Sequence, residues 1–351
     1  MDSTMLSFWT AMVLLIGALE YAMPQLTRRD IFFSVTVAPE FRETPQARRI
    51  LASYQRAIII VTVIALVLVV VAVRRSAELV GAGLLMLQLL AALGVFVIAH
   101  RQTIAYRSAA SAAREASLEP PPRIAGLGLL LLGPYLMLAC AALLMRAHWN
   151  EIPDPMPVHW DLAGNPNGWM PKTPLIFWAL IGSDFAACAI FTFAIVAMLY
   201  FSRQVNVIGA KAREERRFRW IGIAVILAGS YLPASLAFLP LNPHAGLAFG
   251  GVTFFLVIMT VGALELVRRG QGGVRLAPAN GEQVISDRTP DQCWKWGIFY
   301  YNPDDPALMV EKRFGIGWTL NFAHRGAWIF MGLVFASLVF SLGMPLVARY
   351  R

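Results

Sequence analysis

The sequence predicts an all-α polytopic membrane protein with eight transmembrane helices, both termini outside, and a small cytosolic β-rich insert between spans seven and eight. Three observations carry this prediction. Of the 351 residues, 58% are hydrophobic and only 15% are charged, whereas soluble domains carry about 25% charged residues. The apolar residues form discrete blocks, and most basic residues lie in alternate loops between them. This composition excludes a disordered chain and a collagen-like chain.

Each apolar block is long enough, or nearly so, to cross about 30 Å of hydrocarbon. The blocks lie at residues 4–23, 57–73, 78–99, 127–146, 175–201, 218–240, 245–267 and 327–347. Short links join spans two and three and spans six and seven, which indicates two helical hairpins. We expect the first block to be retained as a span, because its apolar run is too long for a signal peptide and follows an acidic residue, Asp2.

The basic residues give the orientation. Of the 30 Lys and Arg residues, 24 fall in loops on one side of the spans and six on the other. Since excess Lys and Arg marks the cytoplasmic side, both termini are expected outside. The net charge of +9 is then explained by topology, so the lipid bilayer is an expected partner and nucleic acid is not.

The spans divide the chain into four regions. They are an N-terminal three-span region with cytosolic loops (1–123), a four-span core (124–267) with an extracytoplasmic cap (147–174), a cytosolic linker and β-rich insert (268–326), and the last helix (327–351). Within the first loop, residues 31–37 are predicted to form a short strand, and Thr44 followed by Pro45 predicts a helix start.

The cytosolic insert is aromatic and strand-like. Trp294, Trp296, Ile298 and Tyr300 alternate at a period of two, which predicts a small β-meander against the membrane face. Its candidate motif residues are Tyr301, Asn302, Asp304, Asp305, Lys312, Gly317, Trp318 and Asn321. The two adjacent aspartates favour a turn built by side-chain-to-backbone bonds, and a Mg²⁺ or Ca²⁺ site is the alternative.

The cap is the most patterned stretch of the chain. Prolines at 153, 155 and 157 enforce an extended entry, residues 158–161 are predicted as a strand, and two Gly/Asn turn dipeptides follow. Its candidate ligand-binding residues are Pro157, His159, Asp161, Gly164, Trp169 and Lys172. His159 and Asp161 project to the same side of an extended segment and are weak candidates for a metal, but an internal hydrogen bond is favoured. No cofactor is expected.

Inside the membrane, Asp184 lies about nine residues into span five and close to the midplane. A carboxylate there is costly and is a functional candidate by default. Gln88 and Tyr231 are candidate polar partners from other spans. Two interpretations stay open: a path for a solute or proton, and a protonated carboxyl group that makes one interhelical hydrogen bond.

Two stretches resemble known sequences. The segment from Pro157 to Trp169, followed by Lys172, resembles the P-V-H-x-x-x-x-G-x-x-x-x-W signature of SdpI-like bacterial membrane proteins, over about residues 124–200. The segment 299–322, with Y-N-P-D-D-P and G-x-G-W-T-L-N-F, resembles an uncharacterised domain often found at the C-terminal end of such proteins. The first resemblance implies a multi-pass protein of the bacterial cytoplasmic (inner) membrane that confers immunity to an extracellular toxin and signals by holding a repressor at the membrane.

The leading hypothesis is a non-enzymatic membrane protein that senses, binds or confers immunity to an extracytoplasmic peptide or small molecule and relays this to a cytosolic protein partner. A small-solute or proton-coupled transporter that uses Asp184 is the alternative. A membrane hydrolase is the least favoured, because neither a nucleophile nor a three-ligand metal set accompanies His159 and Asp161.

Overall fold

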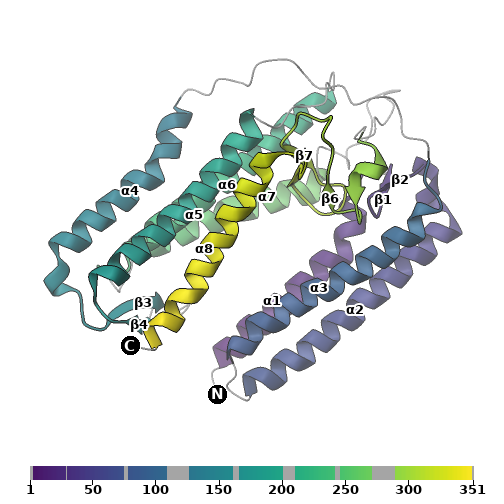
Figure 1. Cartoon of the computed structure of the whole chain (residues 1–351). Helices are drawn as coiled ribbons and strands as arrows, with labels where there is room; N and C mark the ends of the chain where they lie inside the picture. Colours follow the sequence, from purple (N-terminus) through teal and green to yellow (C-terminus); the bar gives the residue numbers. More distant parts are fainter. Residues whose placement is uncertain are drawn as a thin grey trace.

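The computed structural model describes residues 3–28, 30–74, 78–108, 126–160, 166–200, 210–241, 246–270 and 289–349. Within these ranges the chain is mostly helical, with short β-hairpins between the helices (Figure 1). The helices are α1 (Ser3–Leu26), α2 (Pro45–Arg74), α3 (Glu78–Ile104), α4 (Leu127–Ala147), α5 (Pro174–Tyr200), α6 (Ala210–Leu236), α7 (Gly246–Arg269) and α8 (Arg325–Arg349).

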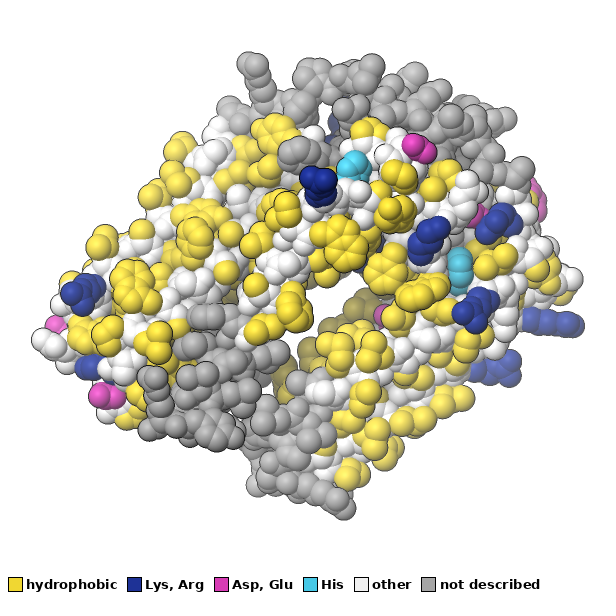
Figure 2. All heavy atoms as spheres, viewed as in Figure 1, with side chains coloured by type: hydrophobic (Ala, Val, Ile, Leu, Met, Phe, Trp, Pro, Cys, Tyr) yellow, Lys and Arg dark blue, Asp and Glu magenta, His cyan; other side chains and the backbone are white. Residues whose placement is uncertain are grey.

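The chain is a multi-pass membrane protein. In the described residues, the seven helices α1 to α7 are long and apolar enough to cross a membrane, and α8 contributes a shorter apolar stretch, Arg325–Ser337. Large apolar side chains cover the outward faces of the helices, as Figure 2 shows; Leu129 is 74% exposed and Phe335 is 68% exposed. Such surfaces are stable only against lipid, so the bilayer is the environment of this fold.

The helices form two bundles. In the first bundle, α2 packs against α1 and α3; in the second bundle, α6 packs against α4, α5 and α7, and α5 packs against α8. Figure 2 shows an open space between the two bundles. The main helix-to-helix contacts therefore lie within each bundle, and other parts of the chain must join the two.

The short hairpins lie at opposite ends of the helices. The hairpin of β3 (Met156–Trp160) and β4 (Pro166–Met170) lies at the same end as both termini (Figure 1). The remaining hairpins lie at the other end and are made by β1 (Ile31–Phe32) with β2 (Val35–Thr36), β5 (Trp294–Lys295) with β6 (Phe299–Tyr300), and β7 (Met309–Glu311) with β8 (Trp318–Leu320).

The prediction of one strand over residues 31–37 was wrong in a specific way. The segment reverses at Phe33 and Ser34, which take positive φ angles of 43° and 63°, and Ile31 pairs with Thr36. Tight hairpins usually place Gly or Asn at such positions, so the sequence carried no turn signal. The predicted start of the next helix is confirmed, because the hydroxyl of Thr44 accepts a hydrogen bond from the Ala47 N–H at 3.2 Å.

The cap is a small domain built onto the ends of α4 and α5. Strands β3 and β4 pair antiparallel, with Met156 opposite Met170 and Pro157 opposite Trp169. A buried apolar cluster joins this hairpin to the two helices; its members are Met145, Ile152, Met156, Met170, Ile176 and Phe177. The cap therefore cannot shift without moving the first turns of α5.

Residues 289–324, called the insert below, form two hairpins rather than one continuous meander. A short 3₁₀ helix (Asp291–Cys293) precedes the first hairpin, and a single bridge between Tyr300 and Asn321 connects the two. Gly297 has φ +74° and lies so close to α3 that an added Cβ would be 2.8 Å from Nδ1 of His100. Only glycine fits at this contact between the insert and the first bundle.

Candidate functional site

Asn321 organises the polar interior of the insert. Its side chain is fully buried and donates to the carbonyl oxygens of Asn302 (2.8 Å) and Asp305 (3.1 Å). The same amide accepts from the backbone N–H groups of Asn302 (3.0 Å) and Ala323 (3.2 Å). One side chain thus satisfies four backbone groups, and it ties the 302–305 turn to the segment that leads into α8.

The side chains of Asn302 and Asp305 build the turn that contains the two adjacent aspartates. The N–H of Asp304 donates to Oδ1 of Asn302 at 3.1 Å, and the N–H of Ala307 donates to Oδ1 of Asp305 at 3.0 Å. The second carboxylate oxygen of Asp305 accepts from the hydroxyl of Tyr300 at 2.9 Å. The buried carboxylate is thereby engaged in folding the turn. Across the residues that the structure describes, no group of three or more metal-binding side chains assembles.

Arg313 joins the insert to the first bundle. Its guanidinium is almost completely buried and donates to Oδ1 of Asp291 at 2.6 Å and to the carbonyl of Ser34 at 3.1 Å. It also contacts both the hydroxyl and the carbonyl oxygen of Thr289. A buried charge of this kind is stable only when its donors are satisfied, so the geometry of the insert and of the β1–β2 turn is tied to one side chain.

Asp291 extends this contact to two further elements. Its carboxylate accepts from the hydroxyl of Thr36 on β2 at 2.6 Å and from the N–H of the same residue at 3.2 Å. The guanidinium of Arg107, just beyond α3, lies 2.9 Å from its Oδ2. We call Arg313, Asp291, Thr36 and Arg107 the latch. The latch is charge-paired, with the side chains of Arg313, Asp291 and Thr36 buried and that of Arg107 46% exposed, and it holds the insert against the first bundle.

An aromatic contact accompanies the latch. Phe314, next to Arg313, places its ring 4.2 Å from that of Phe96 on α3 and 5.9 Å from that of Phe33 (centroid distances). The ring of Tyr54 on α2 lies 6.2 Å from that of Phe314. We call Phe33, Tyr54 and Phe96 the aromatic socket of Phe314. Edge and stacked arrangements at these distances add stability beyond simple burial. The loop between β7 and β8 therefore inserts an aromatic side chain between α2 and α3.

The other face of the insert packs on the second bundle. The ring of Trp318 stacks on that of Phe218 of α6 at 4.9 Å, and a Cβ added to Gly222 would lie 2.7 Å from the Trp318 ring. Leu308 and Leu320 pack with Ala197 of α5. The insert therefore contacts both bundles at once and bridges the space between them.

The loop that carries Phe314 also contains two predicted motif residues. The N–H of Lys312 donates to the carbonyl of Gly317 at 3.0 Å, and Gly317 takes a φ of +96° that favours glycine. The Lys312 side chain reaches solvent, yet the surrounding protein desolvates its ammonium group and lowers its pKa from the usual value. Burial also raises the pKa of the Cys293 thiol, against the opposing charges of Lys295 and Arg313.

Sequence reasoning missed the latch. Arg313 and Asp291 were not among the candidate residues, and Thr36, which donates to Asp291, lies 255 positions from it. Of the candidates, Asn302, Asp305 and Asn321 come together in the insert core. Tyr301 instead lies at the surface with 48% exposure, its N–H donating to the carbonyl of Cys293.

In the cap, the side chain of Lys172 binds backbone carbonyl oxygens of the loop that follows α4. Its ammonium donates to the carbonyl oxygens of Ile152 (2.7 Å) and Trp149 (3.3 Å) and lies 5.7 Å from the centre of the Trp149 ring. Trp169 is half-exposed opposite Pro157. The cap thus presents an aromatic ring to its surroundings while Lys172 closes the loop beneath it.

Three cap candidates lie partly or wholly beyond the described residues. His159 belongs to β3 and pairs with Gly168, but its side chain is not described. Asp161 and Gly164 lie outside the described residues altogether. The pairing of His159 with Asp161 therefore stays a prediction.

The intramembrane candidates do not gather around Asp184. Gln88 lies in the first bundle, where its amide donates to the carbonyl of Val13 on α1 at 3.0 Å. Tyr231 donates to the carbonyl of Leu130 on α4 at 2.9 Å. The expectation that Gln88 is a partner of Asp184 was wrong, because α3 and α5 belong to different bundles. Asp184 is partly exposed on α5.

Two sequence profiles match this chain, one over the cap and one over the insert. A sequence profile described as Domain of unknown function (DUF1648) matches residues 136–182, which cover the cap and the helix ends that carry it. A profile described as Family of unknown function (DUF5808) matches residues 303–328 of the insert and α8. No curated protein and no solved structure matches. The class is thus a multi-pass membrane protein that carries two domains of unknown function.

Proposed function

We propose that this chain is an SdpI-like protein of the bacterial cytoplasmic membrane that binds an extracytoplasmic peptide or small molecule at the cap and relays binding to a cytosolic partner through the insert. The observation that carries the proposal is the course of α5, which packs against the cap at one end and against the insert at the other. Immunity to a toxin is one outcome that such a relay would serve.

Helix α5 is a suitable mechanical link. Its first turns contribute Ile176 and Phe177 to the cap cluster, and its last turns pack Ala197 against Leu308 of the insert. A helix of 27 residues is about 40 Å long and is stiff on this scale. A small shift or rotation of α5 on ligand binding is therefore transmitted to the insert.

The insert is placed to convert such a shift into a change between bundles. Trp318 rests on the second bundle, while Arg313 and Phe314 hold the first. Movement of α5 relative to the first bundle would strain the contacts of the latch and of Phe314. Packed interfaces switch between discrete arrangements rather than deform continuously, so these contacts would change together. The cytosolic partner would recognise the insert surface that this change exposes.

The proposal includes eight spans with both termini outside, α8 being the eighth. The basic-residue asymmetry and the position of the termini at the cap end support it (Figure 1). Alkaline phosphatase fused after residue 351 is expected to be active, and green fluorescent protein fused there is expected to be dark. The same reporters placed at residue 301 must give the opposite pattern. A fluorescent C-terminal fusion would contradict this topology.

The relay is tested by placing a larger side chain at the contact between α6 and the insert. Gly222→Val is expected to push Trp318 off α6, because even a Cβ meets the indole ring at 2.7 Å. In a strain that lacks the gene, this variant and Lys172→Met are both expected to reproduce the transcript profile of the deletion. Gly182→Val is the matched control, since a Cβ there meets nothing within 4 Å.

Immunoblots of the membrane fraction must show equal amounts of each variant. If Gly222→Val and Lys172→Met both restore the profile of the intact gene, the relay proposal fails. Transport along a path through Asp184 has less support, because Gln88 and Tyr231 are engaged with α1 and α4.

A further inference from the structure

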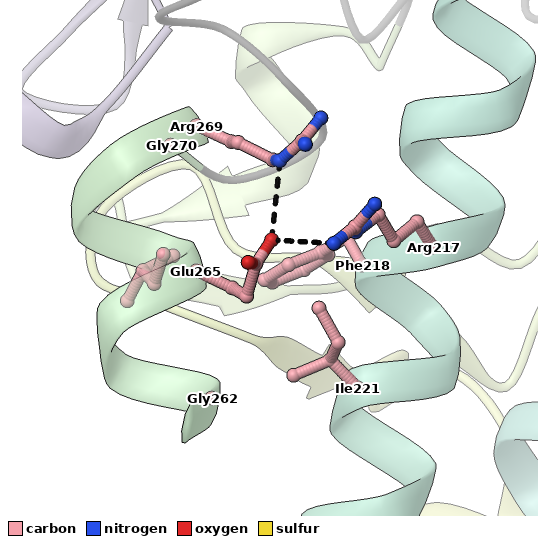
Figure 3. Close-up of a pocket in the computed structure, with 8 residues that line it drawn as sticks. Arg217, Phe218, Ile221, Gly262, Glu265, Arg269 and Gly270 are labelled. Atoms are coloured by element: carbon pink, nitrogen blue, oxygen red, sulfur yellow. Dashed lines mark ion pairs between the residues drawn. The ribbon is translucent and has the colours of Figure 1, made fainter. Parts of the chain in front are cut away.

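A small recess lies where α6 begins and α7 ends, beside the insert. Figure 3 shows Glu265 of α7 between two arginines, Arg217 of α6 and Arg269 of α7. Oε2 of Glu265 lies 3.0 Å from Nη2 of Arg217 and 3.1 Å from Nε of Arg269. One carboxylate therefore orients two guanidinium groups from different helices.

Among the described side chains that line the recess, two arginines share the carboxylate of Glu265. The neighbouring Arg216 and Arg268 are exposed. The side chain of Arg217 is 48% exposed and that of Arg269 is 33% exposed, whereas that of Glu265 is 19% exposed. An anion that approaches from outside thus meets guanidinium groups before it meets the carboxylate.

The floor of the recess is apolar. Phe218, Ile221 and Leu266 line it, and a Cβ added to Gly262 would lie 3.4 Å from a methyl group of Ile221. The helices thus come close together beneath the charges, and the floor continues into the apolar part of both helices. A cationic rim over an apolar floor has the polarity of a lipid, with its charged headgroup above its acyl chains.

The recess also lies at the boundary of two membrane spans. The apolar stretch of α6 begins at Arg216, and that of α7 ends at Arg269. Basic pockets between helices at this depth are where anionic headgroups are held. A guanidinium offers two parallel donors to a phosphate, which makes arginine a better phosphate ligand than lysine at a fixed position.

We propose that Arg217 and Arg269 bind the phosphate group of an anionic ligand in this recess. A membrane phospholipid can supply this group, with its apolar part on the floor, and so can free inorganic phosphate. Phe218 belongs both to the recess and to the stacking contact with Trp318. Occupancy therefore supports the position of the insert on the second bundle.

The experiment uses the purified full-length chain in a neutral detergent. Thermal unfolding is followed while phosphatidylglycerol, phosphatidylcholine or inorganic phosphate is titrated, because a ligand that binds only the folded state raises the midpoint with its concentration. Arg217→Gln with Arg269→Gln is expected to weaken binding of the anionic titrant by about tenfold or more. The matched control, Arg216→Gln with Arg268→Gln, removes the same charge beside the recess and is expected to change binding by less than about threefold.

The three titrants separate the sources. Tighter binding of phosphatidylglycerol than of the other two assigns the recess to a lipid headgroup, and equal binding of inorganic phosphate assigns it to a free anion. Glu265→Gln is a second variant, expected to tighten binding because it removes the competing carboxylate. Equal affinities in the intact chain, in the double variant of the recess and in Glu265→Gln would overturn the proposal and leave the three residues a structural ion-pair cluster. If the double variant does not fold, Arg217→Gln and Glu265→Gln decide, and unchanged affinity in both has the same consequence.

Discussion

Replacing Asn321 with leucine is expected to unfold the insert and to lower its unfolding free energy by about 3–5 kcal/mol. Leucine keeps the branched shape of the side chain but removes all four of its hydrogen bonds, two to carbonyl oxygens and two from N–H groups. Each buried backbone group that is left without a partner costs about 1–3 kcal/mol. Limited proteolysis of the full chain, read by the size of the fragments, measures the effect.

The control is Asp304→Asn, whose side chain is exposed in the same turn. It is expected to change the stability of the insert by less than about 0.5 kcal/mol. Equal protease resistance of Asn321→Leu and the intact chain would show that the fold of the insert does not depend on the Asn321 amide.

Replacing Arg313 with methionine is expected to release the insert from the first bundle. The change leaves the buried carboxylate of Asp291 without its closest cation, and breaking a buried pair from one side costs about 3–5 kcal/mol. The distribution of distances between spin labels at positions 104 on α3 and 301 on the insert is expected to broaden. Both native residues are at least 40% exposed, so labels can be placed there. The native cysteines are replaced by alanine for this measurement.

The neighbouring change Lys312→Met removes the same charge from an exposed side chain and is expected to leave the distance distribution narrow. Asp291→Asn added to Arg313→Met is expected to cost less than the sum of the two single changes, because the buried carboxylate, which Arg313→Met leaves with Arg107 but without Arg313, is then gone. Additive costs, or an unchanged distribution in Arg313→Met, would exclude the latch as the contact that joins the bundles.

The membrane helices could be predicted because hydropathy is a local property of the sequence. The block at 175–201 predicted α5 closely (Pro174–Tyr200), and the turn residues of the cap predicted a structured segment that the structure shows as the β3–β4 hairpin. The β1–β2 hairpin was beyond local signals, because Phe33 and Ser34 hold positive φ angles without glycine. Their conformation is imposed by the aromatic socket and the insert around them.

The residues that join distant segments could not be predicted for a different reason. No spacing rule links Thr36 to Asp291, which lie 255 positions apart in the sequence and meet only in the folded chain. Two adjacent glycines of α7 show the same limit: a Cβ added to Gly250 meets nothing within 4 Å, whereas one added to Gly251 would collide with the side chain of Ser235. Helix rotation decides which of two adjacent glycines faces a neighbour, and the sequence does not state it.

The long separation between the two sides of the latch has a consequence for biosynthesis. Thr36 leaves the ribosome 255 residues before Asp291, an interval of roughly 13–50 s at usual rates of synthesis. During this interval α4 to α7 enter the membrane while the β1–β2 turn lacks its acceptor and its covering aromatic ring. The first bundle therefore lacks its contacts with the insert until a segment near the end of the chain has been made. A chain that stops before residue 289 never forms these contacts, so its first bundle stays exposed to chaperones and proteases.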